Sequence, residues 1–209
     1  MEIRYYGHSC FALIAKDGTS ILTDPYTKVG YELPVGLSAD TLTISHGHFD
    51  HCFTQAIAAK QVINGSGKQT ENIVGIDSYH DPKQGALRGR NIIYKITVDG
   101  ITFCHMGDLG ESCSNALLQA IGKVDVLLIP VGGTYTIDAV QAKEYVDKIN
   151  PKTVIPMHYK PSDGALDIQS ADEFLGLFSE KEIERVPNGK IEYLLEKQTK
   201  RIIYMERIQ

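Results

Sequence analysis

Three histidines and an aspartate stand within a span of six residues in the chain, as His46, His48, Asp50 and His51. Imidazole and carboxylate groups are the usual protein ligands of zinc, iron and manganese. The cluster follows a predicted strand at 41–45, and residues two apart in an extended segment point to the same side. His46 and His48 can therefore converge on one point, while Asp50 and His51 lie past the turn and can reach a second. We interpret the segment as a metal site rather than a solvated loop.

This HxHxDH pattern resembles the signature of the metallo-β-lactamase superfamily. That superfamily supplies a further histidine, a bridging aspartate and a last histidine at later strand ends. The chain has candidates in that order, in His80, Asp108 and His158. Segment 105–109 looks like the one that carries the bridging carboxylate, and 156–159 looks like the one that carries the last histidine. The likeness extends from residue 1 to about residue 160, and it looks closest to a branch of short hydrolases that includes the ascorbate-6-phosphate lactonase.

The resemblance implies a mixed α/β (α+β) fold, a four-layered αββα sandwich with the site at one edge between its two sheets. It also implies two divalent metal ions, with zinc favoured and manganese or iron as alternatives. The first ion would be held by three imidazoles, those of His46, His48 and His80. The second would be held by one carboxylate and two imidazoles, those of Asp50, His51 and His158. Asp108 would bridge the two ions.

His105 is the alternative to His80 as the third ligand of the first ion. It lies three residues before Asp108, and residues an odd number apart face opposite sides of a straight strand. Asp50 and His51 also crowd one side of the site already. We therefore favour His80 as the ligand and interpret His105 as a satisfied packing residue.

Two neighbouring metal ions can share a water molecule and lower its pKa to about 7, which gives a hydroxide at neutral pH. That hydroxide would attack a small ester, lactone or phosphate ester. Asp50 would be both a ligand and the acceptor of the water proton, so Asp50 and Asp108 are the predicted catalytic residues. Two alternatives are kept: a phosphodiesterase or nuclease on the same fold, and a non-hydrolytic di-iron redox or metal-binding protein.

Two further polar residues lie at strand junctions near the cluster. Histidines that bind metals usually donate their second ring N–H to a carboxylate or carbonyl. Asp24, which ends an early strand before Pro25, is the best candidate for that partner, with an ordinary turn aspartate as the alternative. His8 either lines the site or is a buried, hydrogen-bonded histidine.

Substrate selection is expected from three loops, at 26–40, 81–90 and 132–137. Gly132 and Gly133 allow close approach of the backbone, and Tyr135 could cover a substrate. Four more side chains could contact a substrate anion, although a solvated surface position is the plainer interpretation of each. They are Arg88, Arg90, Tyr159 and Lys160.

Length and composition fit one domain, residues 1–209, with a core that needs no disulfides. The net charge of −5 argues against a nucleic-acid partner, which usually leaves a basic patch, so we expect a small-molecule substrate. Four scattered cysteines indicate a reducing compartment. The sequence shows no signal peptide and no apolar run that could span a membrane, so a cytoplasmic location is expected. Association into a homo-oligomer is left open.

The secondary-structure pattern mixes hairpins with strand–helix units, which is typical of helices that cover mostly β layers. The turn signals Asp17-Gly18 and Asp99-Gly100 each predict a hairpin. Helices are predicted at 53–60, 114–121, 138–149 and 170–178. Strands are predicted at 1–6, 10–15, 19–23, 41–45, 73–79, 92–98, 101–104, 124–129, 153–155, 183–186, 191–195 and 201–205.

Overall fold

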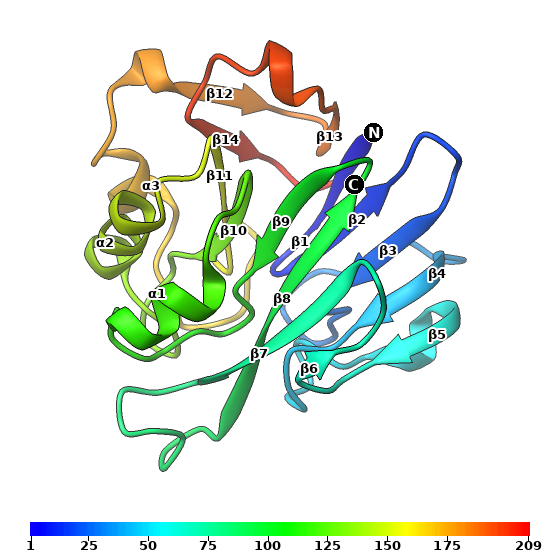
Figure 1. The fold of residues 1–209 in the computed structure, drawn as a ribbon, viewed down its shortest axis with the longest axis horizontal. Coiled ribbons are helices and arrows are strands. Elements are labelled where there is room, and N and C mark those ends of the chain that lie inside the picture. Colours follow the sequence, from blue (N-terminus) through cyan, green and yellow to red (C-terminus); the bar gives the residue numbers. More distant parts are fainter.

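The computed structural model describes residues 1–209 as two β-sheets packed against each other (Figure 1). The strands are β1 (Glu2–Gly7), β2 (Cys10–Ile14), β3 (Ser20–Thr23), β4 (Ser38–Thr43), β5 (Ala58–Ile63), β6 (Gly67–Lys68), β7 (Ile73–Tyr79), β8 (Arg90–Val98), β9 (Ile101–His105), β10 (Val126–Pro130), β11 (Thr153–Met157), β12 (Ile183–Val186), β13 (Lys190–Glu192) and β14 (Ile202–Met205). One sheet has six strands in the order β13-β1-β2-β3-β4-β5. The other has eight, in the order β12-β14-β11-β10-β9-β8-β7-β6.

The six-stranded sheet buries both of its faces. Ile3, Phe11 and Leu13 belong to the large core between the two sheets. Ala12 belongs to a second, smaller core, which Tyr26 of the segment between β3 and β4 helps to close. Neighbouring residues of a strand belong to different cores because successive side chains of a strand point to opposite faces of the sheet.

All three α-helices lie on the side of the eight-stranded sheet (Figure 1). They are α1 (Asn115–Ile121), α2 (Ala139–Ile149) and α3 (Asp172–Leu175). Strands β10 and β11 are buried along their whole length, because helices cover one face of these parallel strands and the other sheet covers the second. Asp138 is the N-cap of α2 and forms a capping box, at the residue where the sequence predicts that this helix begins. None of the helices has both the length and the apolar character needed to cross a membrane.

The helix predicted over 53–60 is wrong. A 3-10 turn (Thr54–Ala56) is followed by β5, which pairs in parallel with β4. The helix preference of alanine amounts to less than about 1 kcal/mol per residue, and the ladder with β4 outweighs it. Helix α3 is also shorter than the predicted 170–178, and two more 3-10 turns occur at Glu180–Glu182 and Leu195–Lys197. The expected mixed α/β fold with two packed sheets is present. Of the four layers expected for an αββα sandwich, the α-helical layer is found over the eight-stranded sheet, and no α-helix covers the six-stranded sheet.

Several strands of both sheets deliver polar side chains to one edge of the sandwich. His80, Asp108 and His158 follow the ends of β7, β9 and β11, and β9, β10 and β11 run in parallel, so the carboxyl ends of β9 and β11 share that edge. His8 and His46 follow the ends of β1 and β4 in the other sheet. Residues far apart in sequence are therefore brought to a single place.

Candidate metal centre

The structure brings together all seven residues that the sequence singled out as metal ligands, and it adds His8. The nitrogen and oxygen atoms of each of three groups lie within 4.8 Å of one another. The outer group consists of His46, His48 and His80. The inner group consists of His8, Asp50, His51 and His158. The third group joins the other two, and it consists of His46, His51 and Asp108.

The carboxylate of Asp108 lies between the outer and inner groups. Its Oδ2 is 3.1 Å from His80 Nε2 and 3.2 Å from His158 Nε2. Its Oδ1 is 2.9 Å from His51 Nε2, and Oδ2 is 3.8 Å from His46 Nε2. Asp108 therefore contacts two histidines of each group, which is the position that a bridging carboxylate requires.

Asp108 is positioned by a tight turn after β9 and by a buried asparagine. Gly107 has φ +54°, and a Cβ there would collide with the side chains of Asn91 and Ser45. Asn91 Oδ1 accepts a hydrogen bond from the backbone N–H of Asp108 (2.9 Å), and its Nδ2 donates to the carbonyl of Met106 (2.9 Å). Sequence reasoning missed Asn91, because an asparagine inside an apolar strand has no spacing signature.

Asp24 holds His51 in place, which was one of its two possible roles. Its side chain is fully buried, and its Oδ2 lies 2.8 Å from His51 Nδ1. The backbone N–H of Ser45 donates to Oδ1 (2.8 Å), and the Ser45 hydroxyl donates to Oδ2 (2.5 Å). Because His51 Nδ1 is taken up by Asp24, its Nε2 faces Asp108.

His8 lies beside the centre and is also buried and hydrogen-bonded, so both interpretations of this residue apply. Its Nε2 is 3.2 Å from Asp50 Oδ2, and its ring centre is 4.3 Å from that of His158. The backbone carbonyl of His8 also accepts a hydrogen bond from the N–H of His158 (2.9 Å). These contacts join the end of β1 to the end of β11.

His105 lies outside all three groups. Its Nε2 is 2.9 Å from the carbonyl of Ser9, and its Nδ1 accepts a hydrogen bond from the N–H of Gly107 (3.3 Å). Neither ring nitrogen is left for a metal ion. The structure thus places His80, and not His105, beside His46 and His48, as we favoured.

The two carboxylates of the centre are held in their ionised form. Burial raises the pKa of Asp108, but the nearby imidazoles of His158 and His51 outweigh burial and keep that pKa well below its usual range. Burial likewise raises the pKa of Asp50, whereas His8 and His51 lower it, and the net pKa lies below the usual range. Ionised carboxylates are the form that binds a metal ion.

The imidazoles divide into neutral and charged ones. Burial is the main cause that lowers the pKa of His46 to about 3 and that of His8 to about 4. Burial also acts to lower the pKa of His51, but the carboxylates of Asp108 and Asp24 outweigh it and raise that pKa well above its ordinary value. In the protein without metal, His51 therefore keeps a proton that a bound cation would have to displace.

Several buried polar atoms of the centre have no hydrogen-bond partner. They are His51 Nε2, His80 Nδ1, Asp108 Oδ1 and both ring nitrogens of His158. The 2.9 Å contact between His51 Nε2 and Asp108 Oδ1 is close enough for an ion pair, but its angles do not make a hydrogen bond. Buried polar atoms almost always have partners, so these donors fit divalent metal ions as the missing partners.

A cavity of about 490 Å³ opens onto this centre. Its lining includes His48, Asp50, His80 and Asp108, together with side chains from two of the three predicted loops. Arg88 comes from loop 81–90 and Tyr135 from loop 132–137, while loop 26–40 contributes none of the lining. Phe49 and Leu166, which the sequence did not suggest, supply apolar surface.

The other candidates for substrate contact lie elsewhere. Tyr159 is buried, and its hydroxyl donates to the carbonyl of Met205 (2.8 Å). Lys160 is also absent from the lining of the cavity. Gly132 does allow a close backbone approach, because a Cβ there would collide with the carbonyl of His158.

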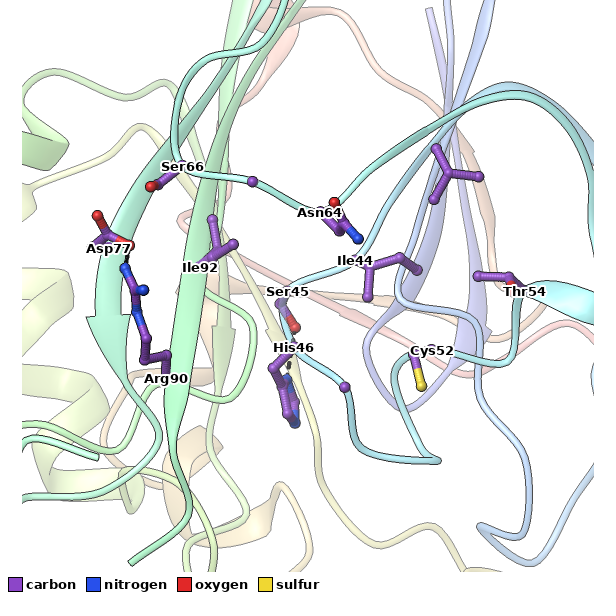
Figure 2. Close-up of a pocket in the computed structure, with 13 residues that line it drawn as sticks. Ile44, Ser45, His46, Cys52, Thr54, Asn64, Ser66, Asp77, Arg90 and Ile92 are labelled. Carbon is purple, nitrogen blue, oxygen red and sulfur yellow. Dashed lines mark hydrogen bonds and ion pairs between the residues drawn. The ribbon is translucent and has the colours of Figure 1, made fainter. Parts of the chain in front are cut away.

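A second, larger cavity of about 710 Å³ has His46 in its lining (Figure 2). Arg90 forms an ion pair with Asp77 on one wall, and Cys52 lies on the opposite wall. Burial raises the pKa of the Cys52 thiol, which does not favour a thiolate nucleophile. We take the smaller cavity as the substrate site because Asp108 lines it.

Comparison with known proteins matches this arrangement to one family. Residues 2–158 match the family model described as a β-lactamase superfamily domain. The chain belongs to this superfamily.

Relatives within the superfamily cover most of the chain. A UPF0173 metal-dependent hydrolase of Carboxydothermus hydrogenoformans is 30% identical, over 76% of this chain and 84% of that protein. A UPF0173 protein of Pyrococcus abyssi is 32% identical, over 76% of this chain and 83% of that protein. A crystal structure from Thermotoga maritima, assigned to the metallo-β-lactamase superfamily, is 38% identical with a TM-score of 0.80, covering 100% of this chain and 99% of that one. The chain is thus a metal-dependent hydrolase of the metallo-β-lactamase superfamily, as its residues indicated.

Proposed function

We propose that the protein hydrolyses a small ester, lactone or phosphate ester at a centre that holds two divalent metal ions. The position of Asp108 carries this proposal. Its carboxylate contacts His80 of the outer group and both His51 and His158 of the inner group. A single carboxylate between two sets of imidazoles is suited to bridge two cations.

The proposed ligands divide as the family resemblance implied. One ion would be held by three imidazoles, those of His46, His48 and His80. The other would be held by one carboxylate and two imidazoles, those of Asp50, His51 and His158. Zinc is proposed for both ions because imidazole and carboxylate suit it, and because the name of the Thermotoga maritima protein proposes a Zn-dependent hydrolase. Manganese and iron suit the same donors.

The residues of the cavity perform the remaining steps. When bound, such ions lower the pKa of water to about 7 and polarise a substrate oxygen. Asp50 lines the cavity with an ionised carboxylate and accepts the proton of the attacking water. Asp24 keeps the Nε2 atom of His51 directed toward Asp108. A cavity of about 490 Å³ suits a small molecule.

The remaining proposals concern the class of substrate and the cellular location of the enzyme. The net charge of −5 supports a small-molecule substrate over a nucleic acid. The four cysteines Cys10, Cys52, Cys104 and Cys113 form no disulfide, which supports a location in the reducing cytoplasm.

The test is elemental analysis of the purified protein, followed by assays on a panel of esters, lactones and phosphate esters. We expect about two equivalents of zinc or manganese per chain. We also expect hydrolysis that is lost on chelation and regained when the metal is added back. A protein that takes up no metal, or that hydrolyses equally well without it, would contradict the proposal. Two equivalents of iron with redox activity and no hydrolysis would replace it with the di-iron alternative.

A further inference from the structure

Arg88 is the one lysine or arginine that lines the cavity over the centre. Its guanidinium carbon lies 5.4 Å from the ring centre of Tyr135, which lines the same cavity. The side chain is half-buried and forms no ion pair with a carboxylate of the protein, unlike the exposed Arg90 two residues later. The N–H groups of the Arg88 guanidinium are therefore free to donate hydrogen bonds to a ligand.

The loop that carries Arg88 is ordered by one buried carboxylate. Asp81, which directly follows His80, is fully buried. Its two oxygens accept hydrogen bonds from four backbone N–H groups, those of residues 83, 85, 87 and 88, at 2.8 to 3.2 Å. The backbone of Arg88 is therefore held at a set position relative to His80, a member of the outer group.

The lining of the cavity combines three kinds of group. Beside the residues of the centre, it contains Arg88 over the ring of Tyr135 and the apolar side chains of Phe49 and Leu166. A guanidinium stacked on an aromatic ring can still donate two parallel hydrogen bonds to a carboxylate or a phosphate. Apolar side chains suit a short carbon chain.

We propose that Arg88 binds an anionic group of the substrate, a carboxylate or a phosphate, that is separate from the bond to be hydrolysed. This inference rests on the proposed hydrolase function and narrows its substrates to esters and lactones that carry such an anion on a short carbon linker. Tyr135 is the positioning residue for the guanidinium.

The test compares acids of matched length by calorimetry on the purified, metal-containing protein. Butyrate has one anionic end, whereas succinate has the same four-carbon chain with two. One carboxylate can bind at the centre, and only succinate has a second for Arg88. We expect succinate to bind about tenfold more tightly than butyrate, which corresponds to one charge-assisted interaction. In Arg88→Gln this preference should disappear while the affinity for butyrate stays the same.

Arg90→Gln is the matched control, because it removes the same charge two residues further along the chain, at the start of β8. Arg90 pairs with Asp77 on the wall of the larger cavity (Figure 2), so its loss should leave the preference for succinate intact. A third probe, 3-phosphonopropionate, distinguishes the two kinds of anion. If Arg88→Gln lowers the affinity for it by a larger factor than the affinity for succinate, the substrate anion is a phosphate, and if the loss is larger for succinate, the anion is a carboxylate.

Equal binding of succinate and butyrate by the wild type, at any strength, would overturn the inference. A preference that survives in Arg88→Gln, or that vanishes equally in Arg90→Gln, would also overturn it. Metal content and hydrolysis are measured on the same preparations, so the proposed function is judged separately. Succinate preference through Arg88 without any hydrolysis would refute the reaction and leave the anion site standing.

Discussion

The outer and inner groups of the centre differ in burial, charge and support. Every member of the inner group is buried, and Asp50 gives it a carboxylate of its own. The outer group has three imidazoles, and His48 among them is exposed. His51 is held by the buried carboxylate of Asp24, whereas His46 Nδ1 has only the hydroxyl of Ser45, at 3.0 Å. A charged and preorganised site binds a cation more tightly, so we expect the inner ion to be the firmly held one.

The largest expected effect comes from the residue that the two groups share. Asp108→Ala removes the carboxylate that contacts both groups, so both ions should be lost and hydrolysis should fall by about a thousandfold or more. Elemental analysis and an activity assay measure this. His105→Gln is the control and should keep both metal and activity, because His105 bonds only to the backbone. Full metal content in Asp108→Ala would refute the bridging role.

A substitution in the outer group should separate the two ions. His48→Ala removes an exposed member of that group and leaves the inner group untouched. We expect about one equivalent of metal to remain, with hydrolysis strongly reduced, because one cation cannot both activate water and orient the substrate as well as two. The matched variant His51→Ala should lose the inner ion instead. Loss of both ions in His48→Ala would show that the groups do not bind independently.

Removal of the support for His51 should weaken the inner ion alone. Asp24→Asn keeps the shape of the side chain but loses the charge that faces His51 Nδ1. Loss of such a supporting partner typically costs about 10- to 100-fold in metal affinity. Competition with a calibrated chelator would measure the two dissociation constants, and an unchanged inner affinity would argue that Asp24 serves the fold only.

The smallest effect concerns pH, and it should also differ between the groups. The raised pKa of His51 means that the inner ion must displace a proton, so its affinity should rise with pH, by about tenfold per unit below that pKa. His46 has a pKa of about 3 and is therefore already neutral above about pH 5. Its titration should not make the affinity for the outer ion depend on pH in that range. Calorimetry in buffers of different ionisation heat counts the released protons. Equal release from both sites would contradict the assignment.

Sequence reasoning located the centre well because its donors follow strand ends. The histidine cluster, His80, Asp108 and His158 could be found from residue type and position, although their role as ligands stays a prediction. The family also followed from these residues.

Contacts between segments distant in sequence were harder to predict. Asn91 was missed because its partner Asp108 is 17 residues away, in a turn whose shape the sequence does not show. The role of His8 depends on the docking of β1 beside β11. The helix predicted at 53–60 was wrong because the helix preference of single residues does not include the pairing of β5 with the neighbouring strand β4. The extent of a single domain over residues 1–209 stays a prediction.

The origin of the donors in both sheets has a consequence for folding. His8 and His46 extend from the six-stranded sheet, while His80, Asp108 and His158 extend from the eight-stranded one. A cation bound among them would fasten one sheet to the other, because the outer and inner groups each take donors from both sheets. We therefore expect metal to bind only after the sheets have docked. The melting temperature should then climb with the concentration of free metal, as mass action dictates for a ligand that binds only the native state.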